Sequence, residues 1–277
     1  MPIDHAAVAD RLIAAYDTVT TLPPITSAEP DFSVADAYRV LEIVETRRRA
    51  EGWTSVGRKI GFTNRTIWPR YGVDAPNWAH IWSHTVHFAP DARATLDLSG
   101  FVNPRIEPEI AFKLSGPVPR SDDPIALLSA VEWMAPAFEI VQCHFPDWKF
   151  KLPDCTAAWA LHGALVVGPS VPINDANRAK IAAQLPRFKV SLSRGGTVVD
   201  RGVGANVLDS PVLTLGYLAR VLAGLPQFPQ LAAGEIISTG TLTDAWPVTS
   251  GQTWSSDYGE LGLQGIDLVL CRNGLSA

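Results

Sequence analysis

From Val56 onward, the chain is divided into short segments rich in β-branched and aromatic residues, with Gly, Pro or Asp between them. Such runs, bounded by turn-forming residues, are typical of strands. One junction reads "RGG" at 194–196, where glycine accepts the positive φ of a hairpin turn. The middle and C-terminal parts of the chain are therefore predicted to be mostly sheet. The segments are VGRKIGF, RIEPEIAFKL, PAFEIVQ, HGALVVG, FKVSLSR, TVVDRGVG, EIISTGTL and IDLVLC.

The first 52 residues show a different, helical pattern. Apolar residues recur at helical spacing in 4–19 and 33–52, and Ser33 with Asp36 fits a capping box. Two further helices are expected among the strands, at 123–133 and at 210–226, the latter with Ser210 as N-cap. The prediction is an α+β fold with a helical N-terminal region at 1–52 and a mixed-β domain at 53–277.

Composition excludes several classes of protein. The net charge is −5, and the basic residues are scattered except for "RRR" at 47–49, which fits a solvated helix face, so no nucleic-acid footprint is present. No apolar run approaches the roughly 18 residues of a membrane span, and the N-terminus is too polar for a signal peptide. Cys143, Cys155 and Cys271 cannot all pair and form no CxxC motif. We expect a cytoplasmic protein that binds neither nucleic acid nor membrane.

Two glutamates in "RIEPEIAFKL" at 105–114 carry the first chemical signal. Successive side chains of a strand point to opposite faces, so Glu107 and Glu109 share one face, with Cα atoms about 6.5 Å apart. A third acid, Glu139, lies among apolar residues in "WMAPAFEIV", where a solvated glutamate is unusual. If Glu139 lies on a neighbouring strand, three carboxylates converge, and their repulsion calls for a cation.

All-oxygen ligands favour a hard ion, so the expected cofactor is Mg²⁺ or Mn²⁺. The alternative interpretation is structural. In it, Glu107 and Glu109 line the wet face of a half-exposed strand and pair with Arg105 and Lys113.

Five segments, in this order, together resemble the 2-keto-4-pentenoate hydratase and oxalocrotonate decarboxylase branch of the fumarylacetoacetate hydrolase superfamily. The resemblance extends from about residue 34 to about residue 270 and implies a mixed β-roll or barrel-like domain, a divalent metal and a cytoplasmic homo-oligomer. The segments are VGRKIGFTN at 56–64, RIEPEIAF at 105–112, PAFEIVQCHFPDWKFKLPD at 136–154, GVGANVLDSPVLTLGYLARVLA at 202–223 and LAAGEIISTGTLTDAWPVTSGQ at 231–252.

Carried over by position, the resemblance assigns Glu107, Glu109 and Glu139 as metal ligands. It assigns Lys59, in "GRKIGFT", as the active-site lysine, and it places Thr241, in "STGTLT", near the substrate. Independently, Lys59 is a cation within an apolar strand-like run, which makes it a candidate partner for a buried anion.

The sequence departs from the family pattern at two places. Where the hydratases have Ala-Asp-Asn, this chain has Ala157, Ala158 and Trp159. Where they have E-P-D-x-G, this chain reads "DAPNWAH", with Asn77 in place of the usual acid and Ala79 in place of the usual glycine. Both changes affect groups that move protons or orient water. A bulkier or more aromatic 2-oxo acid substrate is therefore expected, with Asn77 and Trp159 among the substrate-binding residues.

Histidines and tryptophans supply the remaining candidates. His144 and His162 lie in or beside the resembling segments and are candidate general acids or bases. Trp148 is expected to wall the pocket together with Trp159. The spacing of histidines in "HIWSHTVH" at 80–87 suggests zinc only if the segment is helical, and its composition disfavours a helix.

The resemblance implies a metal-dependent lyase that adds water to a 2-hydroxydienoic (2-oxo-enoic) acid through a metal-chelated enolate. Two other reactions share that enolate: decarboxylation of an oxalocrotonate-like 2-oxo dicarboxylate, and carbon–carbon hydrolysis of an acylpyruvate. A different class remains open as well, a degenerate member that binds a ligand without catalysis.

Overall fold

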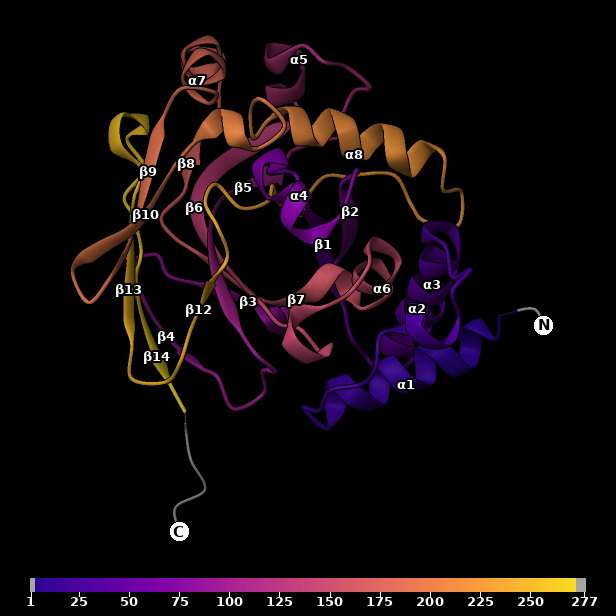
Figure 1. The fold of residues 1–277 in the computed structure, drawn as a ribbon. Helices are drawn as coiled ribbons and strands as arrows, with labels where there is room; N and C mark the ends of the chain where they lie inside the picture. The colour runs from indigo at the N-terminus through magenta and orange to yellow at the C-terminus, as the bar shows by residue number, and fades with distance from the viewer. Residues whose placement is uncertain (1–2, 273–277) are drawn as a thin grey trace.

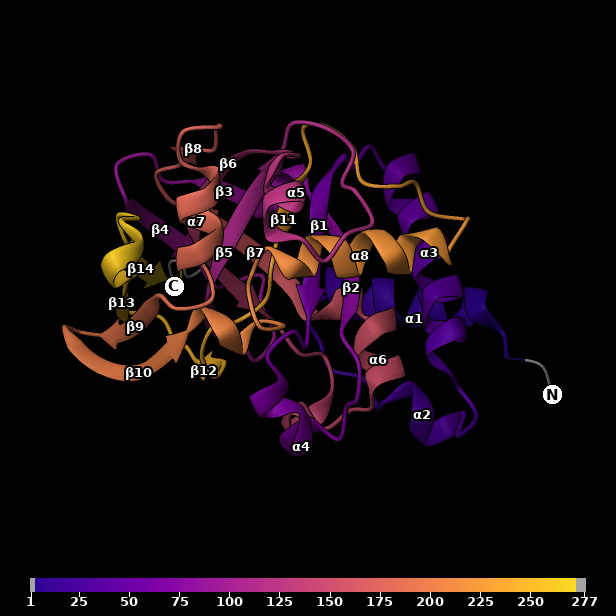
Figure 2. The same cartoon turned by 90° about the horizontal axis from the view of Figure 1, so that it is seen from above.

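The computed structural model describes residues 3–272. Figures 1 and 2 show a helical region at one end of the molecule and a small sheet at the other, with a large curved sheet between them. The predicted mixed β-roll with a small helical N-terminal region is confirmed. The boundary at 52/53 stays a prediction.

Within residues 3–272, nine strands form the large sheet, in the order β2-β1-β11-β5-β6-β7-β3, with β12 beside β5 and β8 beside β6. The bounds are β1 (Ser55–Gly61), β2 (Asn77–Trp82), β3 (Val86–Phe88), β5 (Arg105–Leu114), β6 (Val131–Val141), β7 (His162–Val167), β8 (Val171–Pro172), β11 (Ile236–Ser238) and β12 (Trp246–Pro247).

The small sheet has the order β10-β9-β13-β14-β4. Its strands are β4 (Arg93–Asp97), β9 (Lys189–Arg194), β10 (Thr197–Val203), β13 (Thr253–Asp257) and β14 (Asp267–Cys271). The predicted hairpin at "RGG" is confirmed, because β9 pairs with β10 antiparallel and Gly195 and Gly196 have φ of 56° and 81°.

The helices within the described residues are short apart from α1, α3 and α8. Their bounds are α1 (His5–Asp17), α2 (Ile25–Ala28), α3 (Val34–Ala50), α4 (Trp68–Tyr71), α5 (Pro124–Leu128), α6 (Leu152–Ala157), α7 (Arg178–Gln184) and α8 (Leu213–Ala223). The capping box at the start of α3 is confirmed: Ser33 Oγ accepts from the Asp36 N–H, and the Asp36 carboxylate accepts from the Ser33 N–H.

Both helices predicted among the strands are present, but the extent of one and the N-cap of the other were wrong. The segment 123–133 is helical only over α5, because Val131–Met134 pair instead with β5 and β8. Ser210 is not the N-cap of α8, which begins at Leu213, and the Ser210 hydroxyl has no hydrogen-bond partner within the described chain.

Two hydrophobic clusters cover the large sheet. One packs α1, α3 and α8 against it and includes Leu12, Leu41, Phe112 and Leu215; the other packs the small sheet against it. The middle strands β5 and β6 are therefore enclosed on both faces, as their mostly buried pattern shows. Polar side chains in the centre of these strands are removed from bulk water, which raises the free-energy cost of any charge placed there.

One buried carboxylate joins the N-terminal helices to the segment that follows β6. Asp154, on α6, accepts hydrogen bonds from the Thr26 N–H and hydroxyl, both at 2.8 Å, and from the Lys151 N–H at 2.8 Å. Its side chain is fully buried. The contact fixes α2 against α6.

We predict that Asp154→Ala lowers the free energy of unfolding by about 3 kcal/mol, because three donors lose a charged acceptor in a buried place. Asp175→Ala is the matched control, since the Asp175 side chain is 94% exposed, and its effect is expected to stay within about 0.5 kcal/mol. Urea denaturation of both variants measures the difference. Equal effects would contradict the structural role assigned to Asp154.

Candidate metal centre

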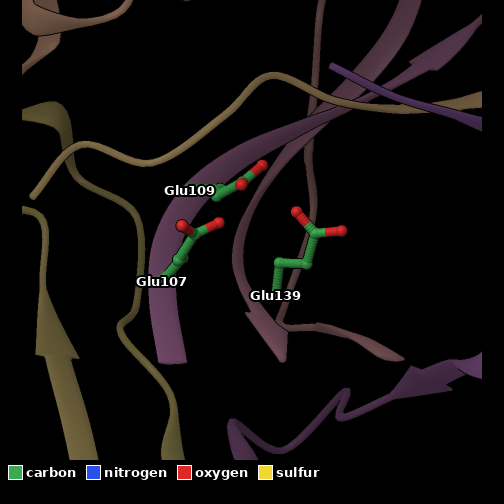
Figure 3. A group of neighbouring side chains, drawn as sticks. All are labelled: Glu107, Glu109 and Glu139. Atoms are coloured by element: carbon green, nitrogen blue, oxygen red, sulfur yellow. The ribbon is translucent and has the colours of Figure 1, made fainter. Parts of the chain in front are cut away.

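The pairing of β5 with β6 brings the three predicted acids together. Glu107 lies directly opposite Glu139 in the antiparallel register, and Glu109 follows on the same face of β5. One oxygen from each carboxylate lies within 4.8 Å of the others. Figure 3 shows the three side chains pointing toward a common space. The condition set by the sequence, that Glu139 lies on a neighbouring strand, is met.

Two of the carboxylates are held in place by fixed donors. Glu109 Oε2 accepts from the Ser238 hydroxyl at 2.5 Å and from the Gly240 N–H at 2.8 Å. Glu139 Oε1 lies 2.7 Å from His162 Nδ1, and the other ring nitrogen lies 2.8 Å from the Thr85 hydroxyl. In each carboxylate one oxygen, Glu109 Oε2 or Glu139 Oε1, is therefore bound by these donors. The second oxygen, Glu109 Oε1 or Glu139 Oε2, is not bound by them.

Lys59 supplies the positive charge of the cluster. Its buried Nζ lies 3.1 Å from Glu139 Oε2 and donates to the Ala160 carbonyl at 2.8 Å. That carbonyl is presented by three consecutive left-handed residues, Trp159 to Leu161, with φ of 54°, 47° and 64°. This conformation is unfavourable for residues other than glycine. Its presence in the turn that contacts Lys59 indicates that the surrounding structure holds this turn in place.

Burial and charge shift the protonation of the cluster. Burial raises the pKa of Glu107 to about 7, although Lys59 opposes the shift. Burial, together with Glu139 and Glu107, holds the pKa of Glu109 well above its usual value. Burial acts in the same direction on Glu139, but Lys59 and His162 outweigh it and hold that pKa below its usual value. Burial opposes the charge of Lys59, yet the three carboxylates raise its pKa.

The donor set fits a hard divalent ion. Glu109 Oε1 and Glu139 Oε2 are buried oxygens without a hydrogen-bond partner, although Glu139 Oε2 contacts the Lys59 ammonium as an ion pair. Buried polar atoms normally have a partner, and an ion between the carboxylates would supply one. Glu107, Glu109 and Glu139 are the residues that would hold it.

The structural alternative, with Glu107 and Glu109 on a wet face, was wrong for Glu109, which is fully buried; Glu107 is partly exposed. The proposed cationic partners bind elsewhere, since Lys113 pairs with Glu132 at 3.4 Å and Arg105 donates to the Tyr71 hydroxyl at 3.0 Å. Within residues 3–272, the acid trio is the only group of three His, Cys, Asp or Glu residues arranged to hold a metal, so the histidines of 80–87 form no such site.

A small cavity of about 40 Å³ opens beside the acids. Four of the predicted residues line it: Lys59, Glu107, Trp148 and Thr241. His162 does not line the cavity and contacts the acid cluster through its hydrogen bond to Glu139.

Three predicted residues lie behind the cavity wall. Asn77 donates to Thr156 Oγ1 at 3.0 Å and to Cys155 Sγ at 3.3 Å, and its buried Oδ1 has no partner. Trp159 packs against Tyr16 on the side of α1. His144 Nδ1 lies 2.8 Å from the Thr20 carbonyl oxygen. The geometry gives no support to Trp159 as a wall or to His144 as a catalytic group.

Sequence reasoning missed several residues of the site. Ser238 and Gly240 were inside a recognised segment, but nothing in the pattern indicated that they would bind Glu109. Ala160 contributes a backbone carbonyl, which no side-chain motif reports. The aromatic residues Tyr71, at the end of the short helix α4, and Phe150, in an irregular segment, line the cavity from places where strand alternation gives no signal.

We predict that Lys59→Met lowers the free energy of unfolding by about 3–5 kcal/mol in the absence of metal, because Glu139 is left buried beside two other carboxyls without its cation. Lys113→Met is the matched control, since Lys113 also lies on a strand but pairs at the surface, and it is expected to cost no more than about 1 kcal/mol. Chemical denaturation in EDTA checks both values. A small effect of Lys59→Met would show that the cluster is not charge-compensated as described.

Comparison with known proteins places this geometry in a family. A family model described as fumarylacetoacetate (FAA) hydrolase C-terminal matches residues 66–264. The chain is 31% identical over 247 residues to 2-hydroxyhexa-2,4-dienoate hydratase of Comamonas testosteroni, with 87% of this chain and 88% of that protein covered. It is 32% identical over 263 residues to 2-keto-4-pentenoate hydratase of Paraburkholderia xenovorans strain LB400, with 94% and 93% covered.

A solved structure gives the same result. The fold resembles 4-oxalocrotonate decarboxylase from Pseudomonas putida G7, complexed with magnesium and adipate, with a TM-score of 0.85 and 25% identity, covering 96% of this chain and 97% of that one. The resemblance predicted from five sequence segments is confirmed. Because the family model covers residues 66–264 and both hydratases match most of the chain, the chain belongs to the fumarylacetoacetate hydrolase family.

Proposed function

We propose that this chain is a divalent-metal-dependent hydro-lyase that adds water to a 2-hydroxydienoic (2-oxo-enoic) acid. The observation that carries the proposal is the acid trio, in which the buried Glu109 Oε1 has no hydrogen-bond partner and Glu139 Oε2 contacts only the Lys59 ammonium. The named hydratases at 31% and 32% identity support this reaction.

Mg²⁺ or Mn²⁺ would be held by Glu107, Glu109 and Glu139. When bound, the ion supplies Lewis acidity that polarises the oxygens of a 2-oxo acid head. The protein holds two of the three ligands in place: Ser238 and the Gly240 N–H fix Glu109, and His162 fixes Glu139. Thr241 and Trp148 contribute to the walls around the head group.

Lys59 is the proposed proton-handling residue. Two of its three N–H groups have protein partners, namely the Glu139 carboxylate and the Ala160 carbonyl, and the lysine lines the cavity. A third N–H is therefore available to a substrate oxygen or carbon. With its pKa raised by the carboxylates, Lys59 holds a proton at neutral pH and donates a hydrogen bond to the negative charge of the substrate.

Decarboxylation of a 2-oxo dicarboxylate is the second candidate. It is favoured by one observation, the similarity at a TM-score of 0.85 to a 4-oxalocrotonate decarboxylase. Both reactions need the same head-group site, and they differ in what the far end of the substrate carries. Hydration is preferred here because the chain has higher identity to the two hydratases.

The assembly and the compartment remain predictions. No helix within residues 3–272 has the length and apolar character that crossing a membrane requires. Phe88 is a large apolar side chain that is 62% exposed and borders a groove with Val86 and Trp133, which supports the predicted homo-oligomer. A cytoplasmic location is proposed with it.

Chelation tests the proposed reaction. After exhaustive treatment with EDTA, loss of dienol absorbance from a 2-hydroxydienoate substrate is expected to stop, and Mg²⁺ or Mn²⁺ is expected to restore it. Glu109→Gln is expected to weaken Mg²⁺ binding by more than about tenfold, while the surface control Glu132→Gln leaves it unchanged. Full activity in the chelated protein would refute the proposal.

Metal binding is expected to depend on pH. Because the pKa of Glu107 is about 7 without metal, this carboxyl is partly protonated at neutral pH, and an ion that binds its carboxylate must displace the proton. Mg²⁺ affinity is therefore expected to fall as the pH is lowered through 7, with proton release on binding. Isothermal titration in buffers of different ionisation enthalpy measures both quantities. Constant affinity between pH 5.5 and 8 would contradict this protonation state.

A further inference from the structure

The side chain of Asn77 carries a buried oxygen that accepts no hydrogen bond from the described chain. The residue is only 1% exposed, and its Oδ1 has no partner within residues 3–272. Buried polar atoms normally have a partner. The surroundings of Oδ1 therefore indicate which donor this acceptor serves.

Thr156 fixes the orientation of the Asn77 amide. The Thr156 hydroxyl donates its only proton to the Leu152 carbonyl at 2.8 Å, so its oxygen can only accept from Asn77. Asn77 Nδ2 donates to that oxygen at 3.0 Å and lies 3.3 Å from Cys155 Sγ. Exchanging the amide oxygen and nitrogen would place two acceptors against each other. Oδ1 is therefore the amide atom that faces away from Thr156.

Oδ1 faces the same space as the Lys59 ammonium. Lys59 and Gly61 are two residues apart on β1, and Asn77 on β2 lies directly opposite Gly61, so all three residues share one face of this strand pair. A Cβ added at Gly61 would lie 2.4 Å from Asn77 Oδ1 and 3.5 Å from Lys59 Nζ. Because Gly61 has no side chain, the amide oxygen and the ammonium are neighbours on this face.

One present partner of Lys59 is an oxygen that the candidate metal centre also needs. Nζ lies 3.1 Å from Glu139 Oε2 and 2.8 Å from the Ala160 carbonyl oxygen. Glu139 Oε2 is also one of the buried oxygens available to a divalent ion. An ammonium and a divalent ion at one carboxylate oxygen repel each other, and a buried site screens that repulsion weakly. Metal binding therefore favours a position of the ammonium farther from Oε2.

We propose that Lys59 has two alternative acceptors: Glu139 Oε2, as the structure shows, and Asn77 Oδ1 when a divalent ion binds the acid trio. Asn77 is then a positioning residue for the lysine, and this inference rests on the proposed function. The Ala160 carbonyl stays a partner in both arrangements, so Lys59 keeps two protein acceptors and one free N–H. The flexible four-carbon stem of lysine allows the change without a movement of the backbone.

An amide at position 77 suits this role because it carries no charge. A carboxylate there would form an ion pair with the ammonium and offset its positive charge. The amide oxygen of Asn77 accepts a hydrogen bond and leaves that charge in place. The full charge of Lys59 then remains for an anionic substrate.

Crystal structures of the metal-free and the Mg²⁺-loaded protein test the two positions directly. Without metal, Lys59 Nζ is expected on Glu139 Oε2; with Mg²⁺, it is expected about 3 Å from Asn77 Oδ1. Nζ still on Glu139 Oε2 in the Mg²⁺-loaded protein would overturn this inference and leave the proposed function standing. A protein that binds no Mg²⁺ at saturation would overturn both.

Asn77→Leu and Asn77→Asp measure what Oδ1 contributes to Mg²⁺ binding. Leucine has a similar shape but no acceptor, so the displaced ammonium gains no partner and Mg²⁺ affinity is expected to fall about tenfold by isothermal titration. Aspartate restores an acceptor and is expected to return the affinity at least to that of the unmodified chain. Asn174→Leu, at an exposed position, is the control and is expected to stay within about twofold. Unchanged affinity in Asn77→Leu, or an equal loss in Asn77→Asp, would contradict the positioning role.

Discussion

The site depends on a like-charge pair that a sheet normally avoids. Glu107 and Glu139 face each other across β5 and β6, and like charges directly opposite on antiparallel strands destabilise a sheet. Glu109 adds a third carboxyl on the same face, fully buried. The fold tolerates this arrangement because Lys59 lies beside Glu139. A divalent ion would neutralise the remaining negative charge of the three carboxylates. The neighbouring strands hold the ligands where such an ion could reach them.

The strand order explains how Lys59 reaches the acids. Strand β11 lies between β1 and β5, so the lysine extends across it from β1. Close approach of β1 and β11 requires Gly57, because a Cβ there would lie only 1.8 Å from the Ile236 carbonyl oxygen. The same strand β11 ends with Ser238, whose hydroxyl binds Glu109. The short strand β11 therefore determines where Lys59 lies and holds Glu109 through Ser238.

Alternation along a single strand was enough to predict part of this site. It placed Glu107 and Glu109 on one face, and the apolar neighbours of Glu139 indicated burial. The direct opposition of Glu107 and Glu139 was not predictable, since the register between two strands depends on tertiary packing and the pattern of each strand alone does not report it. The family resemblance supplied the grouping that local patterns could not.

Backbone conformation accounts for the position of Trp159. Trp159 was expected in the pocket, but the left-handed turn from Trp159 to Leu161 directs the Ala160 carbonyl toward Lys59 and leaves the indole against Tyr16. Left-handed conformations at non-glycine residues are set by surrounding structure and leave no signal in the sequence. The role of His162 was equally hidden, because an imidazole that orients a carboxylate and one that transfers protons look alike in a motif.

The central claim is that these three glutamates share one hard ion, and anomalous scattering from a crystal soaked in Mn²⁺ tests it most directly. The account predicts a single strong anomalous peak in contact with oxygens of Glu107, Glu109 and Glu139, lost in the Glu109→Gln protein. A peak held by other residues, or none at saturating Mn²⁺ with the carboxyls in their described positions, would contradict the account.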